Sequence, residues 1–370
     1  MLHVLRAPVG GLFRHVCDLS RAQAASGHAV GIVCDRGGDA LTERQLDSLR
    51  PHLALGILRV GMSRAIGPSD VLAYHAIRAH ALGLGVDVIH GHGAKGGAYS
   101  RLAGASLKRM GRKIASCYTP HGGSLHYHPA SVQGRIYMAL ERRLARSSDA
   151  LIFESAFSEA RYRAQVGTPG CAMQVVPNGL GEADFVTVTP AVDAADFLFV
   201  GELRHLKGVD VMIDALAQVA RERPVRAVIV GSGPDAAAFK ARAAAAGLGD
   251  SIVFPGAMPA REAFRSGRVL VVPSRAESFP YIVLEAGAAG VPMLATNVGG
   301  IPEIVAGTRT ALLPPDDVDA LAQAMRAALA TPEIYVAKAE ELRSAIARRF
   351  TITSMSLAIL QLYYGALGQG

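Results

Sequence analysis

The chain has 370 residues, of which 50% are hydrophobic and 19% are charged, a balance typical of a folded globular protein and unlike that of a disordered or fibrous chain. This length exceeds the size at which one hydrophobic core stops growing, so we expect two domains. The cysteines show no CxxC pair, which argues against a structural zinc site and favours a reducing compartment; they are Cys17, Cys34, Cys117 and Cys171.

The formal net charge of +7 is unevenly distributed along the chain. Residues 1–185 carry 21 Lys and Arg against 13 Asp and Glu, whereas residues 186–370 carry 17 against 18. A basic half can meet nucleic acid or an anionic membrane face. Nucleic acid is disfavoured, because the arginines are spread through predicted helices and no known recognition motif is present. Two interpretations stay open: a solvated basic surface, and peripheral contact with the inner face of the cytoplasmic membrane.

Neither end of the chain predicts export. Met1 is followed at once by a predicted strand, without the basic stretch and apolar core of a signal peptide, so we expect a cytoplasmic protein. The uncharged stretch 352–368 contains Ser, Thr, Gln and two Tyr. We interpret it as a helix packed on protein and not as a membrane span.

The first half alternates short apolar runs with amphipathic segments. The run 3–7 predicts a strand, and 12–26 predicts a helix that follows a turn at Gly10 and Gly11. The remaining strands are predicted at 29–34, 55–60, 86–90, 113–119, 149–154 and 173–176, and the remaining helices at 69–83, 96–109, 133–146 and 156–166. Repeated strand–helix units predict a parallel, doubly wound α/β sheet.

The turn at Gly10 and Gly11 is a candidate ligand contact. Glycines let the backbone approach a ligand closely, and the start of the following helix offers N–H groups to a phosphate or a hydroxyl. The dinucleotide fingerprint needs three glycines at fixed spacing, so the pattern argues against a nicotinamide enzyme.

Polar side chains cluster where two predicted strands of this half end. His90, His92 and Lys95 follow one strand, and His121 follows the next. This edge is where open α/β sheets bind ligands. The pairs His90-Gly-His92 and His126-Tyr-His128 could be metal ligands, but no carboxylate lies at ligand spacing, so we favour hydrogen bonding to a polar ligand and predict no metal site.

We place the boundary between the two domains in the irregular stretch 180–194, which follows Val-Pro-Asn-Gly at 176–179. The predicted domains are 1–185 and 186–350, with a terminal helix at 351–370 that returns toward the first domain. The second half restarts the alternation, with strands at 196–200, 225–230, 251–254 and 269–272 and helices at 208–222, 235–246, 259–266, 281–290 and 318–329.

Two loops of the second half are candidates for binding an anion and a nucleoside. Arg204 and Lys207 lie between a strand and a helix start, where they could neutralise a pyrophosphate; the alternative is that they are solvated first-turn residues. Gly231 and Ser232 form a turn after the next strand, which is weak evidence by itself. The acids Asp316, Asp317 and Asp319 resemble a metal-binding Asp-x-Asp, but they open a helix, so we favour capping.

Two glutamates follow the strand predicted at 269–272. Glu277 lies in the loop and Glu285 in the first turns of the helix, so both can face the ligand edge of the sheet. The backbone N–H groups of Tyr281 and Ile282 would favour an anion there. The plain alternative is two solvated acids, since glutamates eight positions apart are common by chance.

The sequence PSRAESFPYIVLEAGAAGVP resembles the signature of family-4 retaining glycosyltransferases, with its two glutamates, small-residue helix and Gly-x-Pro turn. TPHGG at His121, Pro-Asn-Gly at 177–179 and Lys207-Gly208 match the family as well, so the resemblance covers nearly the whole chain. Two positions depart from it: Glu202 replaces a usual arginine, which Arg204 could supply, and Pro280 replaces a frequent glycine and removes one N–H donor.

The resemblance implies the GT-B architecture, two doubly wound Rossmann-like domains facing each other across a cleft. It implies roles for His121 against the transferred sugar, Glu277 on its hydroxyls and Glu285 on the ribose. It further implies a diphosphate site and other contacts, which would be made by Gly10, Gly11, Arg204, Lys207, Tyr281 and Ile282 (diphosphate), Gly231 and Ser232 (nucleoside), and His92 and Lys95 (acceptor).

The function implied is transfer of a hexose from UDP- or GDP-hexose to a hydroxyl of a glycan or lipid-linked glycan. We expect retained anomeric configuration, no cofactor and no metal, and a place in lipopolysaccharide or exopolysaccharide biosynthesis. The alternatives are a nucleotide-sugar epimerase, a sugar phosphorylase and a non-catalytic sugar-nucleotide sensor. Donor turnover separates the sensor from the enzymes.

Overall fold

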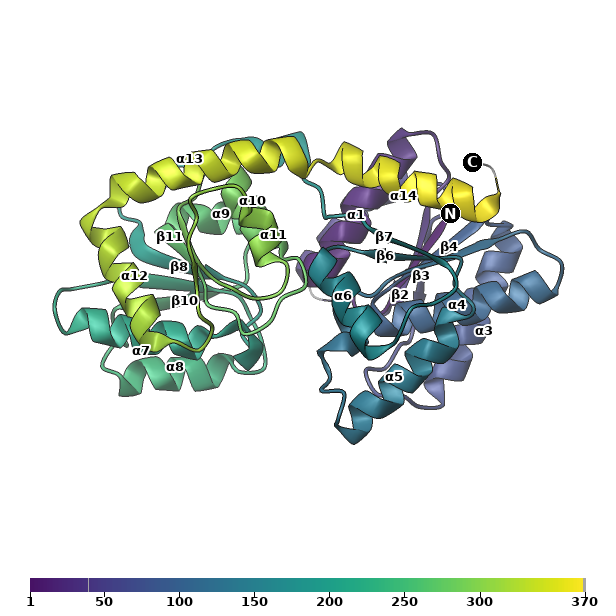
Figure 1. The fold of residues 1–370 in the computed structure, drawn as a ribbon, viewed down its shortest axis with the longest axis horizontal. Coiled ribbons are helices and arrows are strands. Elements are labelled where there is room, and N and C mark those ends of the chain that lie inside the picture. The colour runs from purple at the N-terminus through teal and green to yellow at the C-terminus, as the bar shows by residue number, and fades with distance from the viewer. Residues whose placement is uncertain (39, 369–370) are drawn as a thin grey trace. The chain divides into compact units, whose positions relative to one another are not determined.

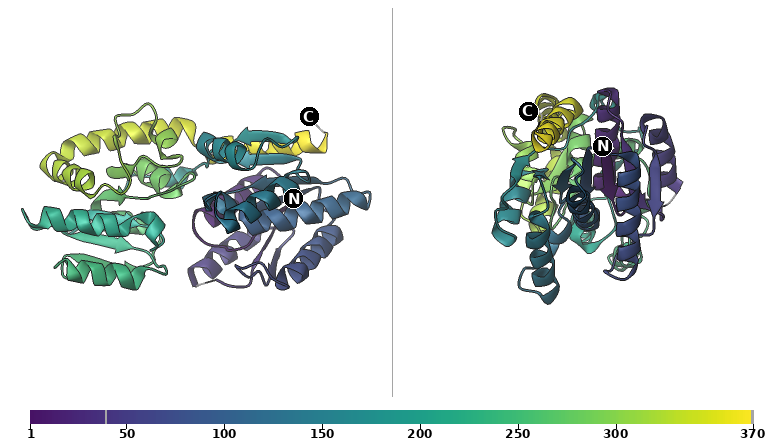
Figure 2. Two further views of the ribbon diagram at one scale, coloured as in Figure 1. Left: turned by 60° about the horizontal axis from the view of Figure 1, so that its bottom comes forward. Right: turned by 90° about the vertical axis from the view of Figure 1, so that its right-hand side faces the viewer.

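The computed structural model describes residues 1–38 and 40–368 (Figure 1). The chain forms two compact units: Met1–Gly179 together with the segment that begins at Ile352, and Leu180–Thr351. Each unit is a parallel α/β sheet with helices on both faces (Figure 2), which confirms the predicted fold class. Within the described part of the chain, no helix is both long enough and apolar enough to cross a bilayer.

The first unit is built on a seven-stranded sheet in the order β3-β2-β1-β4-β5-β6-β7, in which every neighbouring pair is parallel. The strands are β1 (Leu2–Leu5), β2 (Gly31–Asp35), β3 (Ile57–Val60), β4 (Val88–His92), β5 (Ala115–Thr119), β6 (Ala150–Phe153) and β7 (Ala172–Val175). Strand order reverses between β1 and β4, so the loops after these strands and after β5 share one edge of the sheet.

Seven helices of the first unit flank this sheet within the described residues. They are α1 (Gly10–Ala25), α2 (Ala40–Leu49), α3 (Ser69–Leu84), α4 (Gly93–Arg109), α5 (Val132–Ala145), α6 (Ala156–Gln165) and α14 (Ile352–Leu367). The sequence did not predict α2. As predicted, the stretch at 352–368 packs on protein: Met355, Ile359 and Tyr363 of α14 are buried against residues of α1, β4 and β5.

The second unit has a six-stranded parallel sheet in the order β10-β9-β8-β11-β12-β13. Its strands are β8 (Ala195–Val200), β9 (Ala227–Val230), β10 (Ile252–Gly256), β11 (Gly267–Val272), β12 (Met293–Thr296) and β13 (Leu312–Leu313). Its helices are α7 (Val209–Ala220), α8 (Ala236–Ala245), α9 (Ala260–Ala263), α10 (Tyr281–Ala288), α11 (Ile301–Val305), α12 (Val318–Ala330) and α13 (Pro332–Arg349).

Alternation along β8 divides the core of the second unit into two layers. Phe197 and Phe199 pack with α7, α8 and α12, whereas Leu198 packs on the opposite face with α10 and α13. Successive strand side chains point to opposite faces, so a central parallel strand must be apolar at every position. This explains why the strands appear in the sequence as unbroken apolar runs.

The two units divide six residues before the predicted boundary. Leu180 already belongs to the second unit, because its side chain is buried in that core and its N–H donates to the Phe350 carbonyl oxygen at 3.0 Å. The stretch 180–194 therefore contains residues held by the second unit and is not a free linker. Val188, for example, donates its N–H to the Ala289 carbonyl oxygen at 3.0 Å.

Candidate functional site

Glu277 lies in the loop after β11, at the carboxyl edge of the second sheet, with its side chain 8% exposed. Its Oε1 atom accepts hydrogen bonds from Lys207 Nζ at 2.6 Å and from Ser274 Oγ at 2.7 Å. Both bonds fall on one oxygen, and no described residue donates to Oε2. The carboxylate is thus held by two donors while its second oxygen stays available to a hydroxyl group.

Lys207 is brought to Glu277 by a tight turn after β8. It ends a short 3-10 helix, η4 (His205–Lys207), and Gly208 follows with φ +69°. A Cβ atom on Gly208 would lie 1.9 Å from the Pro273 carbonyl oxygen, so only glycine allows the two loops to touch here. The sequence analysis assigned Lys207 to a diphosphate and did not predict its contact with Glu277.

Arg275 ties the same two loops together, and the sequence analysis missed it. Its guanidinium donates to both oxygens of Asp210 in α7, at 2.8 and 2.7 Å, and to Asp316 at 2.6 Å, while its N–H donates to the Leu206 carbonyl oxygen at 2.9 Å. Burial raises the pKa of Asp210, but the Arg275 hydrogen bonds outweigh it and the net pKa is lowered. Bidentate pairs of this kind fix orientation. The only sequence signal was an arginine inside the acidic motif.

Arg204 is less committed to the site than Lys207. Its side chain is 40% exposed and its Nη1 atom lies 3.4 Å from Glu202, the residue that departs from the family pattern. The exposed Arg204–Glu202 pair is weak, because exposed ion pairs are screened by water. Arg204 can therefore turn to an anionic ligand without breaking a buried contact.

The helix α10 begins at Tyr281, with Pro280 at the N-cap and no side-chain cap. Its first turns carry Ile282 and then Glu285, which is half-buried. A second loop supports this segment: a Cβ atom on Gly299 would lie 1.8 Å from the Glu277 carbonyl oxygen, and Gly300 donates its N–H to the Ser278 carbonyl oxygen at 2.8 Å. These two glycines had no role in the sequence analysis.

Gly231 and Ser232 lie beside the loop that carries Arg204. Leu203 donates its N–H to the Ser232 carbonyl oxygen at 2.8 Å, and a Cβ atom on Gly231 would lie 1.8 Å from the Gly201 carbonyl oxygen. Both residues therefore shape the loop at 201–204. Their contact with a nucleoside stays a prediction.

The acids at 316–319 divide between two roles. Asp317 caps α12 by accepting the Ala320 N–H at 2.8 Å, as expected for the start of a helix. Asp316 instead accepts from Arg275. The Asp317 contact agrees with the capping interpretation.

In the first unit, α1 begins at Gly10, which has φ +64° and is exposed together with Gly11. Val9 is the N-cap and provides no side-chain cap. Lys95, by contrast, is engaged elsewhere: Nζ donates to Asp70 at 2.6 Å and to the Ala65 carbonyl oxygen at 2.7 Å. Asp70 also accepts from Tyr99, and its pKa is lowered, because these bonds outweigh the effect of burial. The acceptor role of Lys95 would require it to leave Asp70.

Five histidines meet at the carboxyl edge of the first sheet, and the sequence analysis singled out only three of them. His90 and His92 end β4, His121 follows β5 with φ +49°, His3 lies on β1 and His15 on α1. Four of the five are at most 1% exposed, and His121 is partly exposed. We call these five residues the histidine cluster. His126, the partner of His128 in the second histidine pair, has a side chain outside the described part.

Hydrogen bonds link the cluster in a chain that leads to His121. Gln23 Oε1 lies 2.8 Å from His3 Nε2, His3 Nδ1 lies 3.0 Å from His92 Nε2, and His92 Nδ1 lies 3.1 Å from His121 Nε2. An amide oxygen only accepts, so His3 carries its proton on Nε2 and its Nδ1 accepts. His92 then donates from Nε2 and accepts at Nδ1, and His121 donates from Nε2. The Nδ1 atom of His121 is left as a hydrogen-bond acceptor.

Tyr363 of α14 joins the cluster through its hydroxyl group. Burial raises the pKa of Tyr363. The Tyr363 hydroxyl in turn lies 2.5 Å from His90 Nδ1, and His90 Nε2 lies 2.9 Å from Thr119 Oγ1.

Burial keeps the whole cluster neutral. Removal from water lowers the pKa of His3 to about 3 and that of His15 to about 4. The pKa values of His90, His92 and His121 are also well below the usual range, first through burial and then through repulsion between neighbouring rings. At neutral pH each ring therefore has one N–H and one bare nitrogen.

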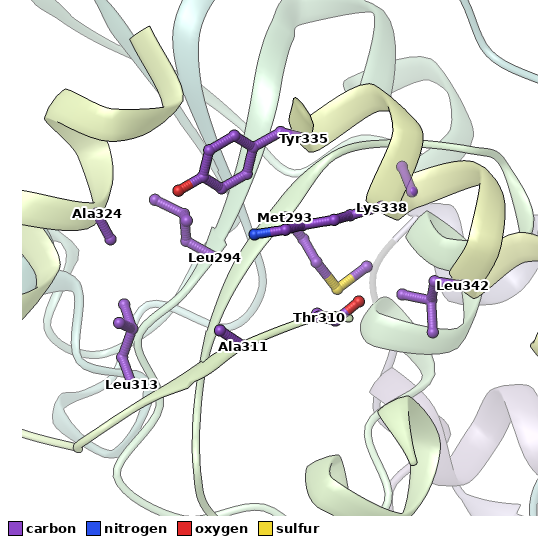
Figure 3. Close-up of a pocket in the computed structure, with 10 residues that line it drawn as sticks. Met293, Leu294, Thr310, Ala311, Leu313, Ala324, Tyr335, Lys338 and Leu342 are labelled. Carbon is purple, nitrogen blue, oxygen red and sulfur yellow. The ribbon is translucent and has the colours of Figure 1, made fainter. Parts of the chain in front are cut away.

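Two hollows in the second unit contain none of the predicted residues. One of about 50 Å³ is lined mostly by apolar side chains, among them Met293, Leu294 and Leu342, together with Thr310 and Lys338 (Figure 3). The other, of about 840 Å³, is lined by 187–192 and 259–265. Neither hollow includes Lys207 or Glu277.

Comparison with known proteins assigns each half of the chain to a family. Residues 9–182 match Glycosyltransferase Family 4, and residues 194–331 match Glycosyl transferases group 1. The chain belongs to these glycosyltransferases. Apart from residues 180–182, the first matched segment lies in the first unit and includes His121, and the second lies in the second unit and includes Lys207, Glu277 and Glu285.

Relatives of this glycosyltransferase have different annotated activities. It is 29% identical to glycogen synthase of Mycobacterium tuberculosis H37Rv, over 97% of this chain and 92% of that protein. It is 28% identical to the D-inositol 3-phosphate glycosyltransferase of Acidothermus cellulolyticus, over 82% of this chain and 74% of that protein. At this level of identity the relatives agree on glycosyl transfer but not on a substrate.

Solved structures share the fold over the full length of the glycosyltransferase. Sucrose-phosphate synthase of Thermosynechococcus elongatus has a TM-score of 0.82 at 24% identity and covers 100% of this chain and 99% of its own. Anabaena HepE, solved with UDP-glucose, has a TM-score of 0.79 at 17% identity, with coverage of 99% and 100%.

Proposed function

We propose that this protein transfers a hexose from UDP- or GDP-hexose to a hydroxyl group of a glycan or lipid-linked glycan, with retained configuration and without a metal ion. The observation that supports this most is the Lys207–Glu277 contact of 2.6 Å, because it puts a cation for phosphate beside a buried carboxylate for sugar hydroxyls. Similar structures solved with UDP and with UDP-glucose support a nucleotide-sugar donor.

The second unit binds the donor in this proposal. Lys207, with Arg204 turned from Glu202, neutralises the diphosphate, and the N–H groups of Tyr281 and Ile282 at the start of α10 bind its oxygens. These groups stabilise the charge that develops on the leaving diphosphate, which is the task a metal ion performs in other transferases. Glu285 accepts the ribose hydroxyls, and Gly231 and Ser232 border the nucleoside.

Glu277 orients the sugar and does not attack it. Ser274 and Lys207 hold its Oε1 atom, so Oε2 is presented in a fixed direction to the hexose hydroxyls. A glycosidase would use two carboxylates on either side of the scissile bond. Here the second carboxylate, Glu285, is assigned to the ribose.

The first unit binds the acceptor and the reacting face of the sugar. His121 is the partly exposed end of the histidine cluster, and its Nδ1 atom accepts a hydroxyl proton in a hydrogen bond. A neutral ring close to the anomeric carbon also tolerates the positive charge of an oxocarbenium-like transition state, whereas an imidazolium would oppose it. Gly10 and Gly11 present the N–H groups of α1 to the diphosphate, and His92 supports His121.

We also propose that α5 rests on an anionic membrane, which would suit a lipid-linked acceptor in surface polysaccharide synthesis on the cytoplasmic side. Val132, Ile136 and Leu140 recur four residues apart and are 74%, 52% and 40% exposed. Arg135 and Arg143 are exposed beside them, and Glu141, the only acid within α5, is buried against Arg101. Exposed apolar side chains flanked by arginine are typical of interfacial helices.

A donor panel tests the proposal directly. The chain is incubated with UDP-, GDP- and ADP-hexoses, and thermal shift and donor turnover are measured for the parent and for Glu277→Gln. We expect one nucleotide to raise the melting temperature of both proteins, and turnover with the parent to be about 10²–10³-fold faster than with Glu277→Gln. Nucleotide binding without any turnover would favour the non-catalytic sensor, and no nucleotide effect at all would overturn the proposal.

A further inference from the structure

Two groups of three histidines within the cluster place their ring nitrogens within 4.8 Å of one another: His3, His90 and His92, and His15, His92 and His121. The first group is wholly buried, whereas the second includes the partly exposed His121. The second group therefore lies nearer to solvent than the first. We call the second group the His15 triad.

His15 presents a buried nitrogen that has no donor. Its Nδ1 atom lies 2.9 Å from Asn178 Oδ1, an oxygen that only accepts, so Nδ1 carries the proton and Nε2 is bare. The residue is 1% exposed, and no described group donates to Nε2. A buried acceptor without a donor destabilises the folded protein, so this arrangement calls for an occupant or a function.

His92 presents a second bare nitrogen to the same place. The hydrogen bonds from Gln23 through His3 place the His92 proton on Nε2. The Nδ1 atom of His92 is then an acceptor and lies 3.1 Å from His121 Nε2. Both His15 and His92 thus donate one ring N–H to an outer partner and aim the other nitrogen inward. Metal-binding histidines have this arrangement, because the outer hydrogen bond fixes the tautomer and orients the ring.

We propose that the His15 triad binds one divalent transition-metal ion of the zinc type, through His15 Nε2, His92 Nδ1 and His121 Nε2. Neutral imidazoles are the form that binds such ions. On binding, the His121 proton leaves Nε2 and the ring takes its other neutral tautomer, with the proton on Nδ1. A water molecule completes a four-coordinate site.

The required movement is small. Zinc–nitrogen bonds of 2.0–2.1 Å in tetrahedral geometry place the ligand atoms about 3.3 Å apart. The His92 and His121 nitrogens already lie 3.1 Å apart, and the widest separation in the triad is at most 4.8 Å, so closure needs a shift of roughly 1.5 Å or less. His121 sits at the partly exposed end, where such a shift is easiest.

The consequence for activity rests on the proposed function. A metal-bound His121 would have its ring turned to the ion and its Nδ1 atom protonated, so it could no longer accept a hydroxyl hydrogen bond. We therefore infer that the ion inhibits transfer.

The test is a titration of the tag-free full chain with Co²⁺, followed by visible absorption, and with Zn²⁺, followed by equilibrium dialysis. We expect one Co²⁺ with the intense absorption of a four-coordinate site. His15→Gln should weaken binding at least tenfold, and Asn178→Ala, which removes the outer partner of His15, should weaken it 10–100-fold. His75→Gln is the matched control, because His75 is exposed on α3, and it should leave the affinity unchanged.

Circular dichroism establishes that each variant is folded, and Asn178→Ala supplies the test if His15→Gln does not fold. Absorption typical of six-coordinate Co²⁺, or equal affinity in the parent, His15→Gln and Asn178→Ala, would overturn the site. The ratio of transfer with and without Zn²⁺ is measured separately. Four-coordinate binding without inhibition would leave the metal site standing and contradict the role of His121 in transfer.

Discussion

Lys207 Nζ and Glu277 Oε1, separated by 70 positions in the chain, lie 2.6 Å apart at the edge of the second sheet. The contact depends on Gly208, which lets the loop after β8 touch the loop after β11, and on Arg275 of the second loop, which bonds to Leu206 and Asp210 after β8. A cation and a carboxylate are thus held together before any ligand arrives. The proposed donor site is built on this pair.

Removing either member of the pair should affect catalysis more than folding. We expect Lys207→Met and Glu277→Gln each to lower kcat/KM by about 10²–10³-fold, and the double variant to lose little more than the worse single one, because the two groups act on one donor. Steady-state kinetics measures this. The exposed pair Arg242 and Asp214 is the control, since Arg242→Met should change kcat/KM less than about twofold. Additive losses would contradict joint action.

Gly208 and Gly247 offer a matched comparison, because both have left-handed backbone, with φ of +69° and +73°. An alanine costs about 1–2 kcal/mol at such a position. Only at Gly208 would its Cβ also meet the Pro273 carbonyl oxygen, since nothing lies within 4 Å of Gly247. Gly208→Ala should therefore lose both stability and donor affinity, whereas Gly247→Ala should lose stability alone. Urea unfolding and donor titration distinguish the two, and equal donor affinity would argue against loop contact at Gly208.

Gln23 should act on the reaction through His121, as a positioning residue. Gln23→Leu removes the acceptor of the His3 proton, so His3, His92 and His121 can each adopt either neutral tautomer. Gln23→Glu keeps an acceptor oxygen and should preserve the order. We expect kcat to fall in Gln23→Leu with little change in the donor KM, and the ¹⁵N NMR signals of the His121 ring to show mixed tautomers. Those signals are assigned by comparison with His121→Asn, in which they are absent. An unchanged His121 spectrum in Gln23→Leu would contradict the order derived from the hydrogen bonds.

The buried histidines should make the protein less stable in acid. Folding lowers the pKa of His3 from 6.5 to about 3 and that of His15 from 6.5 to about 4, so between these values the unfolded chain binds more protons than the folded one. Stability is therefore full above about pH 6.5 and is lost as the pH falls, by about 1.4 kcal/mol per pH unit for each ring. The urea midpoint from pH 7 to 4 measures the slope. In His15→Gln this slope should be smaller by the amount that corresponds to about one proton. An unchanged slope would show that His15 is not a buried, neutral residue in the folded protein.

Membrane contact through α5 should depend on its apolar stripe. Ile136→Glu should weaken sedimentation with vesicles that contain anionic lipid, because it puts a charge among exposed apolar side chains. Val253→Glu is the control, since Val253 is 56% exposed on β10 of the other unit. Comparison with vesicles of neutral lipid shows how much of the binding comes from attraction between the arginines and the anionic lipid. If both variants sediment like the parent, α5 is not the docking surface.

Much of the fold could be predicted because a buried parallel strand must be apolar on both faces. Phe197, Leu198 and Phe199 illustrate this, since neighbouring residues of β8 enter different layers of the core. The boundary was less predictable: Leu180 follows Pro-Asn-Gly, but its place is decided by a hydrogen bond to Phe350, which no local pattern reveals. The helix α2 was missed although its apolar residues recur as regularly as those of α1.

The site was predictable where a short motif carries it and not where distant segments meet. Lys207 and Glu277 each stand in a recognisable local pattern. Arg275 and Asp210 do not, because their importance comes from a contact across 65 positions. His3 and His15 look like ordinary core or helix residues in the sequence, and only the packing of β1 and α1 against β4 brings them to His92 and His121. An isolated histidine carries no signal for such a contact.

The place of α14 has a consequence for how the protein is made. Met355, Ile359 and Tyr363 complete the core of the first unit, and Tyr363 reaches His90 at 2.5 Å, yet these residues leave the ribosome only after all of Leu180–Thr351 has been translated. The first unit must therefore wait, with the part of its sheet that α14 covers still exposed, while the second unit is synthesised and can fold on its own. During translation, the second unit can therefore complete its folding before the first unit does.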